Sequence, residues 1–153
     1  MKKRSLARLV VVLVSASFAA VLLAQPPAFA RTEPETPPPG EGVICAWAIY
    51  SAMAEVGSRC HPGEDVEVQK ELTRAVASID AYVIANSTPA PTPEQIEGFK
   101  RSQGSVGDTK AQLCRGDMDE LYGAIAAQGA PEIRRFIDEL VARPGPPTWG
   151  DCI

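Results

Sequence analysis

Four cysteines are the residues of this chain best suited to covalent or redox chemistry. They are Cys45, Cys60, Cys114 and Cys152. None of the intervals between them is the Cys-x-x-Cys spacing of a redox pair or of a haem-attachment site. In an oxidising compartment, an even number of widely spaced cysteines indicates structural disulfides. We therefore predict two disulfides and no cysteine thiolate that binds a metal.

His61 is the only histidine of the chain, and its place between Cys60 and Pro62 admits two interpretations. The ring could act as a general base or as a metal ligand beside a cysteine. It could also be a turn residue between two helices, which is the interpretation we favour. One histidine cannot build a multi-histidine zinc site, so we predict no metal and no cofactor.

Asp117, Asp119 and Glu120 resemble the start of a calcium-binding loop. An EF-hand loop has glycine at its sixth position and an acid at its twelfth, where this chain has Tyr122 and Gln128. We therefore assign the three acids to the first turn of a helix, where the helix dipole favours negative charge.

Two pairs of carboxylates could carry out general acid–base catalysis, namely Glu71 with Asp80 and Glu94 with Glu97. Their spacing equally fits the solvated faces of amphipathic helices. No nucleophile elbow, Walker loop or dinucleotide fingerprint accompanies them in the sequence. An enzyme with an unrecognised helical site is therefore the third of our hypotheses.

Three aromatic residues, Trp47, Tyr50 and Trp149, are candidates for the walls of a ligand groove. Trp149 lies in a proline-rich tail that Cys152 could anchor, so its side chain could close such a groove as a lid. The alternative is that all three simply complete the hydrophobic core, which is the more common fate of aromatic residues at helical spacing.

Residues 1–30 have the features of a cleaved signal peptide. Lys2, Lys3 and Arg4 precede an apolar run over residues 9–24, and Ala28-Phe29-Ala30 supplies small residues for a signal peptidase. The run has about 16 residues, fewer than the roughly 20 that span a membrane. We expect export to the periplasm or full secretion, with no membrane span after cleavage. An uncleaved anchor is the alternative.

Removal of this leader would make the chain more acidic. The whole chain has a net charge of −4, and four of its 15 basic residues but none of its 19 acids lie in residues 1–30. The mature chain therefore has a net charge of about −8, which argues against binding to nucleic acid or to an anionic membrane surface.

The remaining sequence predicts one all-α domain. Residues 31–41 contain four prolines and no large apolar residue, so we expect a disordered lead-in. Residues 42–153 form the predicted domain, a disulfide-stapled bundle of about five helices. The expected helices cover about residues 43–59, 64–85 and 93–113, with a break near Gly104 in the third. Two more helices are expected, one after Gly116 and one after Gly129. The first is apolar on nearly all sides and should be central.

The length of the first predicted helix decides the pairing of the cysteines. Cys45 and Cys60 are 15 residues apart, which is roughly 22 Å along a helix, whereas a disulfide needs Cα atoms within about 7 Å. If the first three helices run up, down and up, Cys60 and Cys114 lie at the same end of the bundle. We therefore predict the disulfides Cys60–Cys114 and Cys45–Cys152.

Two functional hypotheses of different classes follow from export, small size and the lack of a catalytic motif. The first is a non-catalytic protein that binds an envelope or secreted protein, such as an inhibitor, an immunity protein or a chaperone-like protein. The second is a carrier of a small apolar ligand.

Overall fold

All regular secondary structure in the described part of the chain is α-helical, as predicted. A computed structural model describes residues 36–104 and 110–150, so the expected signal peptide over residues 1–30 and Cys152 lie outside it. The helices are α1 (Val43–Cys60), α2 (Val66–Asn86), α3 (Pro93–Gly104), α4 (Lys110–Leu113), α5 (Asp117–Gln128) and α6 (Ala130–Leu140). The predicted third helix ends at Gly104, where a break was expected, and its last part is the separate α4.

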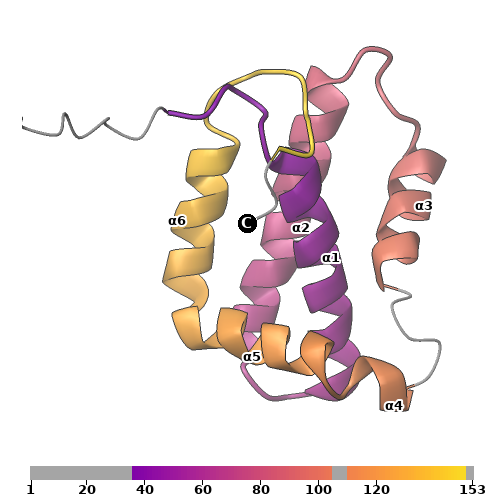
Figure 1. Cartoon of the computed structure of the whole chain (residues 1–153), viewed down its shortest axis with the longest axis vertical. Helices are drawn as coiled ribbons and strands as arrows, with labels where there is room; N and C mark the ends of the chain where they lie inside the picture. Colours follow the sequence, from indigo (N-terminus) through magenta and orange to yellow (C-terminus); the bar gives the residue numbers. More distant parts are fainter. Residues whose placement is uncertain (1–35, 105–109, 151–153) are drawn as a thin grey trace, which may run out of the picture. The chain divides into compact units, whose positions relative to one another are not determined.

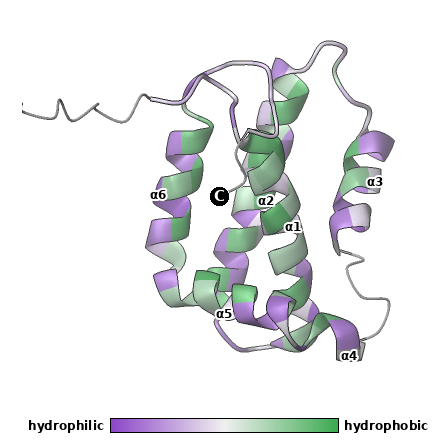
Figure 2. Cartoon of the chain, in the orientation of Figure 1, coloured by the Kyte–Doolittle hydropathy of each residue, from purple (hydrophilic) through white to green (hydrophobic). Residues whose placement is uncertain are grey.

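Helix α1 is the central element, because nearly all of its circumference is apolar. It packs against α2, α3, α4 and α5, and Figure 1 shows it beside α2 in the middle of the bundle. Figure 2 shows hydrophobic residues along much of α1, whereas hydrophilic and hydrophobic residues alternate along α6. The fully enclosed residues of α1 are Val43, Met53 and Val56. The prediction of a central apolar first helix is therefore confirmed.

The outer helices are amphipathic, as their sequences indicate. In α2, a single stripe that includes Leu72, Ala75 and Ile79 is fully buried against the core. The start of α3 is a capping box: the backbone N–H of Gln95 donates to Thr92 Oγ1 at 3.3 Å, and the N–H of Thr92 donates to Gln95 Oε1 at 2.8 Å. No helix among residues 36–104 and 110–150 is long and apolar enough to cross a membrane.

One of the two predicted disulfides is confirmed. Cys60, the last residue of α1, is bonded to Cys114 just after α4, with the two Cα atoms 5.3 Å apart. Closing a loop of 54 residues stabilises the fold by roughly 4 kcal/mol in the chain-entropy treatment. Cys45 is also disulfide-bonded, while its predicted partner Cys152 lies outside the described residues.

Two proline-rich segments, residues 36–41 and residues 144–148, lie side by side over the start of α1 (Figure 1). The backbone N–H of Thr148 donates to the carbonyl oxygen of Gly40 at 2.9 Å, and the N–H of Ile44 donates to Thr148 O at 3.1 Å. Gly40 has φ of +83°, and a Cβ there would lie 2.2 Å from Pro146 O. Residues 36–41, expected to be disordered, thus have a defined place, because the tail supplies their hydrogen-bond partners.

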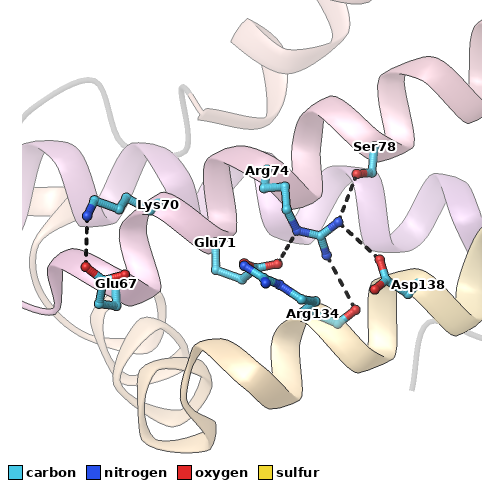
Figure 3. Close-up of polar contacts among 7 residues, drawn as sticks. All are labelled: Glu67, Lys70, Glu71, Arg74, Ser78, Arg134 and Asp138. Atoms are coloured by element: carbon cyan, nitrogen blue, oxygen red, sulfur yellow. Dashed lines mark hydrogen bonds and ion pairs between the residues drawn. The ribbon is translucent and has the colours of Figure 1, made fainter.

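An ion cluster around the buried carboxylate of Glu71 joins α2 to α6 (Figure 3). Glu71 on α2 is only 2 % exposed. Its Oε2 accepts hydrogen bonds from Nε and Nη2 of Arg134 on α6, at 3.1 and 2.6 Å, and its Oε1 accepts one from Arg74 Nε. Arg74 Nη1 also lies 3.1 Å from Asp138 Oδ1 on α6. Burial would raise the pKa of Glu71, but the hydrogen bonds and charges of Arg134 and Arg74 hold that pKa below its usual value.

We expect Glu71→Gln to lower the free energy of unfolding by about 2 kcal/mol, because two charged hydrogen-bond donors lose their anionic partner. The matched control is Glu67→Gln on the same helix. Glu67 pairs with Lys70 at 2.8 Å, but both side chains are well exposed, so this change should cost less than about 0.5 kcal/mol. Urea unfolding of both variants measures the difference, and equal effects would contradict a structural role for the ion cluster around Glu71.

Candidate functional site

The main candidate site is a groove of about 620 Å³ between α1, α2 and α3. Its lining comes from one face of each helix, since the residues recur at intervals of three and four. The lining consists of Ser51, Ala54, Glu55 and Arg59 of α1, Thr73, Val76, Ala77 and Asp80 of α2, and Glu97, Lys100 and Arg101 of α3. We refer to this feature as the three-helix groove.

Small side chains create the space inside the three-helix groove. Ser51 and Ala54 face it from α1, and Ala77 faces it from α2. Helices α2 and α3 each pack on α1, so these short side chains leave a hollow between the two outer helices. Ala54, Ala77 and Val76 give this hollow an apolar surface.

Most of the charged residues at the groove form ion pairs with one another. Lys100 Nζ lies 2.9 Å from Asp80 Oδ2 and 2.6 Å from Glu97 Oε1. Burial would lower the pKa of Lys100, but the hydrogen bonds to Glu97 and Asp80 raise it overall. Arg59 Nη1 lies 3.3 Å from Glu55 Oε1. Arg101 is different: it is exposed, and no ion pair or hydrogen bond ties its guanidinium to any other described residue.

Ser51 is the most unusual polar residue of the groove. It is 7 % exposed, and its Oγ is buried without a hydrogen-bond partner among the described residues. Buried hydroxyl groups in folded proteins are nearly always hydrogen-bonded, because an unsatisfied one carries a desolvation cost of about 1–3 kcal/mol. A ligand that brought a polar atom to Ser51 Oγ would remove this cost.

The aromatic residues predicted to line a groove have different surroundings. Trp47 stacks on Phe99 with ring centroids 4.0 Å apart, and Trp149 lies 6.5 Å from the same ring. Tyr50 instead stacks on Phe136 at 6.1 Å. Trp47 and Tyr50 are buried in the core, and none of the predicted three lines the three-helix groove. A groove formed by all three stays a prediction.

His61 is clamped between two carboxylates. Its Nε2 lies 2.8 Å from Asp119 Oδ1 and its Nδ1 lies 3.2 Å from Glu64 Oε2. Its ring stacks on that of Tyr122, with centroids 4.6 Å apart and an interplanar angle of 8°. The hydrogen bond to Asp119, followed by the contacts with Glu64, outweighs burial and raises the pKa of His61.

In its protonated form, His61 donates a hydrogen bond to a carboxylate from each ring nitrogen, and both nitrogens are then engaged within the protein. His61 follows the last residue of α1, in agreement with the predicted turn. Asp117, Asp119 and Glu120 lie in the first turn of α5, also as predicted. The described ranges contain no group of three or more His, Cys, Asp or Glu residues that could hold a metal ion.

In each of the two predicted acid–base pairs, the two carboxylates have different interaction partners. Glu71 faces α6, where it binds Arg134, whereas Asp80 binds Trp47 Nε1 at 2.7 Å and Lys100. Glu94 is exposed in the first turn of α3, where a hydrogen bond within its own residue and one to Thr92 lower its pKa. Glu97 is bound to Lys100. All but Glu94 therefore have a cationic partner.

Comparisons with known proteins identify no relative, since no family model, curated protein or solved structure matches this chain. The inference of function therefore rests on the residues of the three-helix groove.

We expect the stability of the protein to fall as the pH rises through the pKa of His61. Because the folded-state pKa lies above the value of about 6.5 for an unfolded chain, the stabilisation is complete below that pH and is lost above the raised pKa. Urea unfolding of the wild type and of His61→Gln at about pH 6 and pH 9 measures this effect. The variant should lose part of the pH dependence, and identical profiles would contradict the role of the Asp119–His61–Glu64 contact.

We expect Ser51→Ala to raise the free energy of unfolding of the ligand-free protein by about 1 kcal/mol, because it removes an unsatisfied buried hydroxyl. Ser58→Ala is the matched control for helix propensity, since Ser58 is on the same helix, is exposed and donates to Glu55 O at 3.0 Å. Denaturant unfolding compares the two variants. A loss of stability in Ser51→Ala greater than in Ser58→Ala would mean that the hydroxyl is satisfied in the folded chain.

Proposed function

We propose that this chain is an exported, non-catalytic binding protein that holds a small, partly apolar ligand in the three-helix groove. The observation that carries the proposal is Ser51, a residue of the groove lining whose buried hydroxyl has no partner among the described residues. Of the two hypotheses drawn from the sequence, the carrier of a small ligand thus receives the stronger support.

The dimensions and surface of the three-helix groove suit a small molecule. Its volume of about 620 Å³ falls within the range of roughly 300–1,000 Å³ that is typical of ligand pockets. Such pockets combine an apolar lining with a few polar groups that fix the orientation of the ligand. Here Ala54, Val76 and Ala77 supply the apolar lining, while Ser51 and Arg101 are the polar groups for which the described part of the chain offers no partner.

The proposed export draws on two independent features. The first is the signal-like sequence of residues 1–30, with its basic start and its apolar run. The second is the Cys60–Cys114 disulfide, because disulfides form and persist in oxidising compartments such as the periplasm and the extracellular space.

A protein partner is the second candidate function. Its support is the exposure of two large aromatic side chains, Phe136 at 44 % and Trp149 at 54 %. Aromatic residues are enriched at the centres of protein–protein interfaces. An envelope or secreted protein remains the partner class that this candidate implies.

Native mass spectrometry of gently purified full-length protein tests the proposed function. We expect an adduct of small-molecule mass in the wild type and its loss in Ala77→Trp, because the indole would occupy the groove. Ala124→Trp is the matched control, since Ala124 is also exposed on a helix but lies on α5, outside the groove lining. This variant should keep the adduct.

A wild-type protein that carries no adduct and takes up no small amphipathic molecule from a panel would overturn the proposal. Retention of the adduct by Ala77→Trp would place the ligand elsewhere on the molecule. An adduct of protein mass that survives in Ala77→Trp but is lost in Trp149→Ala would instead support the second candidate.

A further inference from the structure

The pattern of ion pairs at the three-helix groove favours one class of ligand. The lining contains three acidic residues, and each lies within an ion pair. Asp80 and Glu97 both contact Lys100, while Glu55 contacts Arg59. Among the described cations of the lining, only Arg101 lacks such a partner. The six charges of the lining sum to zero, and Arg101 is the one whose ion-pairing capacity no described residue uses.

The carboxylates of the groove are poorly placed to bind a cationic ligand. Asp80 accepts a hydrogen bond on each oxygen, from Trp47 Nε1 at 2.7 Å and from Lys100 Nζ at 2.9 Å. Glu97 is bound to the same ammonium group at 2.6 Å. A cationic ligand would have to compete with Lys100 for these oxygens, whereas an anion at Arg101 would displace no ion pair or hydrogen bond with a described residue.

Building on the proposed function, we infer that the ligand is a small amphipathic carboxylate, whose anionic group binds the Arg101 guanidinium at the mouth of the groove. A guanidinium presents two parallel N–H groups to a carboxylate, which gives both affinity and orientation. The apolar body of the ligand then lies against Ala54, Val76 and Ala77. The ion pair Arg59–Glu55 lies on the α1 side of the same groove.

Titration calorimetry with octanoate and octan-1-ol, two probes with the same chain length, tests the inference on the full-length protein. We expect octanoate to bind more tightly than octan-1-ol to the wild type. Arg101→Gln should weaken octanoate binding by about fivefold, the effect of one partly exposed charge pair, and should leave octan-1-ol binding unchanged. Added salt should weaken octanoate binding to the wild type more than to Arg101→Gln.

Arg115→Gln is the matched control, because Arg115 is also exposed but is not part of the groove lining. Its affinity for octanoate should equal that of the wild type. If both probes bind equally and Arg101→Gln changes neither affinity, the charge inference is wrong while the proposed small-ligand function stands. If neither probe binds and native mass spectrometry shows no adduct, the proposed function fails as well.

Discussion

The architecture depends on the need to cover a helix that is apolar on nearly every side. Helix α1 carries no charge from Val43 to Ala54, so water must be excluded from most of its surface. Helices α2, α3, α4 and α5 accordingly pack on it, and Phe136 of α6 stacks on its Tyr50. The three-helix groove lies where α1 presents Ser51 and Ala54, because side chains of this size leave the flanking helices α2 and α3 with a hollow between them. The constraint that builds the core thus also creates the candidate site.

Local rules explain why much of the fold could be predicted from the sequence. Apolar periodicity and capping residues identified the helices, and the length of α1 excluded a Cys45–Cys60 disulfide and led to the correct Cys60–Cys114 pair. The place of residues 36–41 could not be predicted in this way. Their partner, the segment around Thr148, is more than a hundred residues away, and no local pattern indicates that two proline-rich segments pair.

The candidate site was harder to predict because it consists of small and charged residues rather than large aromatic ones. Trp47 and Tyr50, which the sequence offers as candidates for a groove, are buried and lie outside the three-helix groove. The three-helix groove instead forms where one face of each of α1, α2 and α3 comes together, and this arrangement depends on tertiary packing.

The ion cluster between α2 and α6, in contrast, leaves a signal in the sequence. Glu71 lies three residues after Val68 and four before Ala75, on the buried stripe of α2. A carboxylate on a buried stripe requires a cationic partner, and Arg134 supplies it from α6.

The most direct measurement of the central claim is a two-dimensional NMR titration of the isotope-labelled protein with octanoate. A ligand in the three-helix groove would shift the backbone amide signals of residues around Ser51, Ala54, Ala77 and Arg101, while those of α5 and α6 stay in place. Saturable shifts confined to that set are the predicted result. Shifts centred on Phe136 or Trp149, or no saturable shift at any residue, would contradict the assignment of the groove as the binding site.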